Sequence, residues 1–177
     1  GTSSYFIEEK NSIFGRIFGI PIIEVSNSNA FEAFNYYRST AWQIRGVLHP
    51  LHNIFNSGNK EVYAYRFDWD DHRKWPINLK EIIGSAHGTE IPLIMGNTKI
   101  VGNLGPFIYP RGPSKYFTSK NIMNFWANFA ETGTPGVSTN NIEWKKFKHN
   151  NDLNNYFIVL DKRKNLKIHE FNKSFDD

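Results

Sequence analysis

Apolar and polar positions alternate in ways that predict both helices and strands. Between residues 30 and 56, apolar side chains recur mostly at intervals of three and four, as in an amphipathic helix, and Pro50 is expected to break or kink it. Residues 61–69 are rich in β-forming side chains and predict the clearest strand of the chain. Residues 1–30 instead predict loop with short helical turns around Gly15, Gly19 and Pro21.

The second half of the chain predicts a loop-rich stretch, a helix and a hairpin. Residues 70–113 are loop-rich, and only residues 90–95 suggest a short helix. Thr118 or Ser119 is expected to cap a helix that ends before Gly133 and Pro135. Its stripe at 3.6-residue spacing is expected to be buried against a sheet and consists of Ile122, Phe125, Trp126 and Phe129. Two short strands, 156–160 and 166–169, flank a turn at 161–165, so the whole is α/β or α+β material.

Composition narrows the class of protein. The 177 residues are 40% hydrophobic and 21% charged, which is typical of one soluble globular domain, and the 16% of aromatic residues favours a thick layered fold. The net charge of +4 is spread along the chain, and the short basic runs near residues 145–148 and 162–164 suit solvated turns, so we expect no nucleic-acid partner. No apolar stretch approaches the ~18 residues that a membrane span requires. Cysteine is absent, no zinc spacing or phosphate loop is present, and the compartment stays undetermined.

Of the six histidines, His87 is the best candidate for a general base. It stands among small residues in Gly84-Ser85-Ala86-His87-Gly88, after a predicted strand and loop, and Gly88 allows the sharp turn that such a loop needs. A merely structural histidine is the alternative. For His49 and His52, three apart around Pro50, structural or surface roles are favoured over a metal pair.

The remaining histidines predict no chemistry. His72 lies in the acidic cluster Asp68, Asp70, Asp71, for which a solvated loop is favoured over a calcium site. His149 and His169 lie among polar residues and are expected to be exposed.

Several stretches, in order along the chain, resemble type B carboxylesterases and cholinesterases. The string His87-Gly88-Thr89-Glu90-Ile91-Pro92-Leu93 is similar to the histidine loop of that family. Before it, residues 62–68 resemble the strand that leads into the loop, and after it residues 124–135 resemble the family's helix with its Thr-Gly-x-Pro stop. Residues 144–147 and 156–161 follow in the expected order. Residues 1–60 match more loosely.

This resemblance implies a fold and a reaction. The fold would be the C-terminal part of an α/β-hydrolase: last strands of a mostly parallel sheet, histidine loop, closing helix and terminal hairpin. Residues 1–177 would then form one portion of a domain that is incomplete without an N-terminal part. The reaction would be hydrolysis of a small-molecule carboxylic ester through an acyl-serine, with His87 as the catalytic histidine and with no cofactor and no metal.

The other members of the triad are expected outside these residues. No Gly-x-Ser-x-Gly elbow and no Gly-Gly oxyanion loop is present, so an N-terminal chain or segment would carry the serine. The acid would precede Gly1, with Glu8 and Glu9 as less favoured candidates. Glu90 is expected to fix the histidine loop. Burial as ordinary core is favoured over a border of the acyl pocket for Ile91, Leu93, Ile94 and Met95. A non-catalytic cholinesterase-like adhesion module is the rival hypothesis.

Overall fold

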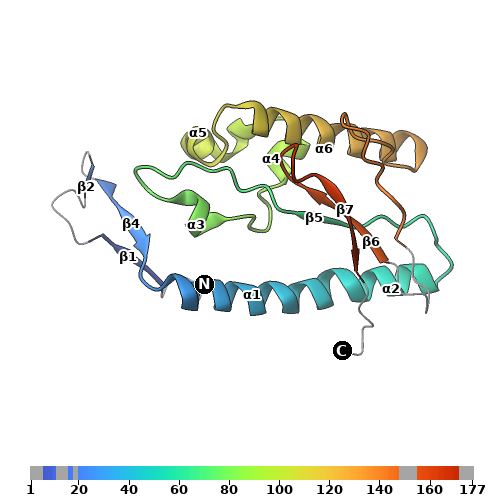
Figure 1. Ribbon diagram of the computed structural model, residues 1–177, viewed down its shortest axis with the longest axis horizontal. Coiled ribbons are helices and arrows are strands. Elements are labelled where there is room, and N and C mark those ends of the chain that lie inside the picture. Colours follow the sequence, from blue (N-terminus) through green and yellow to red (C-terminus); the bar gives the residue numbers. More distant parts are fainter. Residues whose placement is uncertain (1–5, 11–15, 18–19, 148–154, 172–177) are drawn as a thin grey trace.

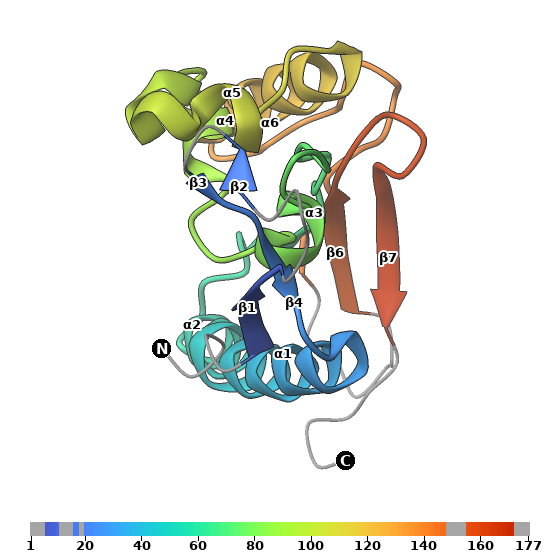
Figure 2. The ribbon, with the colours of Figure 1, turned by 90° about the vertical axis from the view of Figure 1, so that its left-hand side faces the viewer.

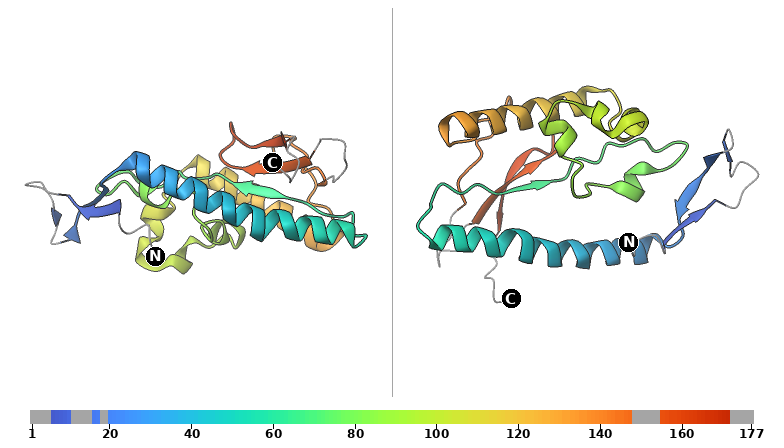
Figure 3. Two further views of the ribbon diagram at one scale, coloured as in Figure 1. Left: turned by 90° about the horizontal axis from the view of Figure 1, so that it is seen from below. Right: turned by 180° about the vertical axis from the view of Figure 1, so that it is seen from behind.

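A small sheet lies between two helical layers in the computed structural model, which describes residues 6–10, 16–17, 20–147 and 155–171 (Figure 1). One layer is α6 (Pro113–Thr132), and the other is a rod made of α1 (Ser28–Gln43), the π-helical turn η2 (Ile44–Leu48) and α2 (His49–Asn56). Figure 2 shows the same order after a quarter turn, with strands running between the two layers. The view from behind in Figure 3 agrees.

The sheet contains three strands in the order β5-β6-β7. β5 (Tyr65–Phe67) runs parallel to β6 (Asn155–Leu160), and β6 pairs antiparallel with β7 (Lys167–Phe171). The predicted terminal hairpin is therefore confirmed. The predicted strand 61–69 is confirmed only for residues 65–67. Before it, the Val62 carbonyl accepts a hydrogen bond from the Phe147 amide, outside the sheet, and the Ala64 carbonyl accepts two, from the Trp144 indole and from the Ile158 amide of β6.

The N-terminal region differs from its prediction. Instead of loop with helical turns, it forms two short antiparallel pairs: β1 (Ile7–Glu9) with β4 (Ile23–Val25), and β2 (Arg16–Ile17) with β3 (Ile20–Pro21). The physical reason is the run Ile20-Pro21-Ile22-Ile23-Glu24-Val25, whose β-branched side chains suit a pleated strand. Gly15 and Gly19 lie outside the described residues.

The predicted helix between residues 30 and 56 is confirmed, but Pro50 does not break it. Asn27 caps α1, because its Oδ1 accepts a hydrogen bond from the Ala30 amide at 3.0 Å. Pro50 is the second residue of α2, and the helical conformation runs into it from Leu48 and His49. The irregularity lies just before it, in the π-helical turn of η2.

Helix α6 begins earlier than predicted and buries most of the predicted stripe. It starts at Pro113, whose fixed φ suits a first helical turn, so neither Thr118 nor Ser119 is its cap. It ends where expected, with Gly133 in the left-handed conformation. Ile122 and Phe125 are fully buried, and Trp126 is half-buried.

The expected burial of Phe129 is wrong, since 46% of that residue is exposed. Phe129 lies one turn beyond Phe125, and its ring meets Tyr63, which precedes β5, at 5.7 Å between centroids. The helix has therefore passed the edge of the sheet at this point.

Short helices connect β5 to α6 and complete the core. They are α3 (Leu79–Ile83), α4 (Ile91–Ile94), the 3₁₀ helix η3 (Thr98–Leu104) and α5 (Gly105–Ile108). The larger core cluster joins Trp69, Leu93 and Tyr109 to residues of α6 and β6, and a smaller one joins Leu51 of α2 to β6. Among the described residues, none of the helices combines the length and apolar character that a membrane crossing requires.

Candidate active site

His87 lies on a tight turn between α3 and α4, in residues 84–90, here called the histidine loop. The amide and the hydroxyl of Thr89 both donate to the Ala86 carbonyl, at 3.1 and 2.6 Å, and so close the turn around His87. Gly88 has φ +88°, which side-chain-bearing residues rarely adopt, although a Cβ there would meet no neighbour. The predicted role of Gly88 in a sharp turn is therefore confirmed, and it is conformational rather than steric.

The imidazole of His87 is exposed and contacts one aromatic ring. Its centroid lies 5.5 Å from that of Trp42, which is near the end of α1, and the two rings are tilted by 52°. In the part of the chain that the structure describes, no hydrogen bond ties this imidazole to a carboxylate or hydroxyl. Both ring nitrogens are thus available to groups that approach from outside.

The candidate acids of this chain do not reach His87. Glu8 and Glu9 are exposed on β1, and β1 pairs with β4, which directly precedes α1. His87 contacts α1 at the other end, a helix length of roughly 20 Å away at 1.5 Å per residue. Neither glutamate is therefore placed as the orienting carboxylate.

Residues that follow His87 fulfil their predictions only in part. The predicted short helix is confirmed as α4, and its Leu93 is fully buried. Ile91 and Met95 are 49% and 65% exposed, so the expectation that they are core residues is wrong for both. Glu90 supports α4 through its carbonyl, which accepts hydrogen bonds from the Leu93 and Ile94 amides, while its carboxylate raises the pKa of Tyr109 and Tyr65 after the larger effect of burial.

His72 corrects the prediction of a solvated acidic loop. Only 4% of it is exposed, and each ring nitrogen faces a backbone carbonyl: Nδ1 lies 2.5 Å from the Ile108 oxygen and Nε2 lies 2.8 Å from that of Gly84. No local pattern could reveal this burial, because the partners lie 12 and 36 residues away. Its neighbours in sequence are polar, but the loop folds inward.

The acidic residues beside His72 are paired with cations. Asp68, Asp70 and Asp71 form salt bridges with Arg66, Lys80 and Lys162, respectively, at 2.7, 2.5 and 2.8 Å. Burial acts to raise the pKa of Asp71, but hydrogen bonds from Lys162 and Ser114 and the charge of Lys162 outweigh it and hold that pKa below its usual value. This cluster is thus a charge-balanced structural network.

Of the other described histidines, two pack against aromatic rings and one is exposed. His49 is exposed, His52 packs 6.4 Å from the ring of Phe147, and half-buried His169 packs 4.8 Å from that of Phe157, so the expected exposure of His169 is wrong. His149 lies outside the described residues. No group of three or more metal-ligating side chains occurs among the residues that are described.

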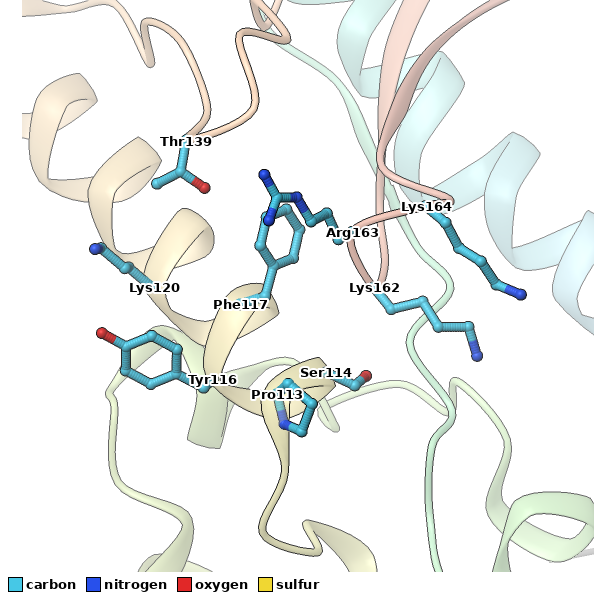
Figure 4. Close-up of a pocket in the computed structure, with 9 residues that line it drawn as sticks. All are labelled: Pro113, Ser114, Tyr116, Phe117, Lys120, Thr139, Lys162, Arg163 and Lys164. Atoms are coloured by element: carbon cyan, nitrogen blue, oxygen red, sulfur yellow. The ribbon is translucent and has the colours of Figure 1, made fainter.

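A pocket of about 490 Å³ lies elsewhere, between the first turns of α6 and the β6–β7 turn (Figure 4). Its lining includes four cationic side chains, which are Lys120, Lys162, Arg163 and Lys164. Figure 4 shows Lys120 pointing to the opposite side from Lys162 and Lys164, and Lys162 is already bound to Asp71. The pocket contains no residue of the histidine loop.

Comparisons with known proteins agree on one family. The model of the carboxylesterase family matches residues 26–175. Acetylcholinesterase of Danio rerio is 36% identical over 103 residues, and that of Electrophorus electricus is 35% identical over 83 residues. These matches span 54% and 47% of this chain but only 15% and 12% of the two relatives. Among solved structures, a PNB esterase is 25% identical with a TM-score of 0.45, covering 62% of this chain and 19% of that one.

Proposed function

Because the chain belongs to the carboxylesterase family and carries part of its α/β-hydrolase fold, we propose that it supplies the catalytic histidine, His87, of a carboxylic ester hydrolase. The observation that carries this proposal is the placement of His87. Its imidazole is exposed, unbonded within the described residues, and mounted on a closed turn between two helices. A general base needs this combination of access and a fixed mounting.

The role of His87 follows from the chemistry of acyl transfer. A serine oxygen attacks the ester carbonyl while imidazole Nε2 accepts the serine proton, and the imidazolium then returns that proton to the leaving alcohol. Water repeats the sequence on the acyl-serine. Neither step needs a cofactor, and the substrate would be a small ester.

The serine and the acid would come from an N-terminal chain or segment. Two features support this: no described residue completes a triad around His87, and α1 leaves Trp42 62% exposed beside it. In the assembled protein, His87 Nε2 is expected within ~2.6–3.2 Å of the serine oxygen. The carboxylate would orient the opposite nitrogen, Nδ1.

The test is His87→Ala in the assembled protein, with exposed His49→Ala as the matched control. Hydrolysis of p-nitrophenyl esters should fall by about 10⁴-fold or more for His87→Ala and stay near wild type for His49→Ala. Unchanged turnover in the His87 variant would end the assignment. A well-folded assembly that hydrolyses no ester even as wild type would instead favour the adhesion module.

A second test addresses the missing partner. The 177-residue chain is purified alone, and its association state and esterase activity are measured. We expect association or no activity, since it lacks a serine elbow. A monomer with full activity would refute the need for another chain or segment.

A further inference from the structure

Two side chains hold the entrance of the histidine loop. His72 Nε2 lies 2.8 Å from the carbonyl oxygen of Gly84, the first residue of the loop, and Ser85 Oγ donates to the Trp69 carbonyl at 3.2 Å. Gly84 ends α3 with φ +53° and ψ −147°, a conformation that glycine tolerates best. The carbonyl that His72 contacts is thus at the point where the loop leaves α3.

A third side chain holds the exit of the loop. The hydroxyl of Tyr109 donates to the carbonyl of Thr89 at 2.8 Å. Tyr109 is 2% exposed and stacks on fully buried Trp69, with centroids 5.7 Å apart and planes 7° from parallel. A buried ring held by stacking has little freedom, so its hydroxyl is a fixed point for the backbone two residues after His87.

His72 at the start of the loop and Tyr109 at its end pack together, with Trp69, as one unit. The His72 ring stands edge-on to Trp69 at 5.3 Å and to Tyr109 at 6.3 Å, and its Nδ1 faces the carbonyl of Ile108, the residue before Tyr109. We call Trp69, His72 and Tyr109 the loop clamp. Of its four polar side-chain contacts, two end on carbonyls of the histidine loop, one on the segment that carries Tyr109 and one on Ser114 of α6.

The clamp is itself fixed to α6. The Trp69 indole N–H donates to Ser114 Oγ at 2.9 Å, and Ser114 donates to Asp71, which also binds Lys162. Ser114 lies in the first turn of α6, and Lys162 lies in the turn between β6 and β7. The loop is therefore tied through the clamp to the longest helix and to the sheet.

We propose that Trp69, His72 and Tyr109 are positioning residues that set the location of the His87 imidazole for proton transfer. The proposal rests on the proposed function of His87. The imidazole of His87 is exposed, and among the described residues only Trp42 contacts it. Its position therefore depends on the backbone at both ends of the seven-residue histidine loop. A misplacement of about 1 Å can cost on the order of 10²-fold in rate, which is why two such anchors matter.

The first experiment is Tyr109→Phe in the assembled esterase. The change removes only the hydroxyl and keeps the stack on Trp69, so the fold should persist. We expect kcat for p-nitrophenyl esters to fall roughly tenfold with KM within about twofold, because the ester is still bound but the base is less well placed. Tyr116→Phe is the matched control, since Tyr116 is 68% exposed on α6, and it should leave both constants unchanged.

Hydrogen exchange provides a second measurement on these variants that does not depend on activity. Hydrogen exchange of the amides in residues 84–90 should become faster in Tyr109→Phe and in His72→Gln, whereas residues 157–160 of β6 should exchange as in wild type. His49→Gln is the control for His72→Gln, because His49 is exposed on α2. Faster exchange everywhere would show general destabilisation and would count against a positioning role.

The outcomes separate this inference from the function on which it rests. If His87→Ala abolishes hydrolysis while Tyr109→Phe and His72→Gln keep kcat within twofold of wild type, the clamp fails and the function stands. If His87→Ala retains activity, the proposed function fails, and the positioning role fails with it. Lower kcat together with faster exchange confined to the loop supports the clamp.

Discussion

Helices α1 and α6 are both long and both carry aromatic residues, but α6 buries more of its side chains. α6 buries Ile122 and Phe125 completely and also buries the polar Thr118 and Asn121. α1 buries only Phe31, and it leaves Tyr36, Tyr37 and Trp42 between 62% and 73% exposed. Large aromatic side chains at such exposure are typical of surfaces that another molecule or segment covers.

A helical spacing of apolar residues therefore predicts a helix without predicting which surface the helix packs on. α6 meets β6, Trp144 and the short helices, whereas α1 meets only a few described side chains, including Phe6 and His87. The exposed side of α1 next to His87 fits the proposal that the serine-bearing part lies there. The following changes test the contrast.

The largest expected effect is on the buried helix. Phe125→Ala should lower the free energy of unfolding by about 3–5 kcal/mol, because it opens a cavity in the main core cluster. Phe129→Ala, one turn later on the same helix and 46% exposed, should cost much less. Urea unfolding of the two variants measures both. Equal losses would show that burial does not distinguish these positions.

Alkaline pH should lower the stability of the core around Tyr109. Burial raises the pKa of Tyr109 to about 12, with a smaller contribution from Glu90, whereas an unfolded tyrosine ionises near 10. The contribution of neutral Tyr109 to the free energy of unfolding is complete below pH 10. It is lost as the pH rises towards 12, by at most about 3 kcal/mol. Urea unfolding at pH 8, 10 and 11 measures the loss, and the part due to Tyr109 should be missing in Tyr109→Phe.

A matched pair of tryptophans compares the helices directly. Trp126→Ala should destabilise the protein by about 2–3 kcal/mol, since half-buried Trp126 contacts the rings of Tyr65 and Trp144 at 5.2 and 5.5 Å. Trp42→Ala should change the stability of the isolated chain by about 0.5 kcal/mol or less. A large loss for Trp42 would mean that α1 is covered within this chain after all.

A loss smaller than those of Phe125→Ala and Trp126→Ala is expected at the start of α1. Asn27→Ala removes the cap on the Ala30 amide and should cost about 1 kcal/mol. The residue before α6, Gly112, makes no side-chain cap, so Gly112→Asn provides the converse test. Circular dichroism during thermal unfolding follows both. No change for Asn27→Ala would show that α1 does not depend on its cap.

The sequence predicted those elements whose signal is local. The periodicity of α6, the stop at Gly133, the hairpin around residues 161–165 and the turn at Gly88 all depend on neighbouring residues, and they are confirmed. The burial of His72 was missed because it depends on carbonyls of Gly84 and Ile108, which no local pattern reveals. His87 was singled out by the small residues of its loop, the family resemblance strengthened that assignment, and its catalytic role stays a prediction.

Parallel pairing of β5 with β6 has a consequence for the order of folding. Tyr65 pairs with Ile158 across about ninety residues, whereas Val159 pairs with Lys167 across the short turn of the hairpin. Closing the longer loop costs about 2 kcal/mol more in chain entropy. During synthesis, β5 leaves the ribosome long before its partner exists, and at about 5–20 residues per second this delay lasts several seconds or more. Over that interval the nascent chain carries β5 without its partner strand β6. A chaperone that shields β5 during this period is therefore expected to raise the yield of folded protein.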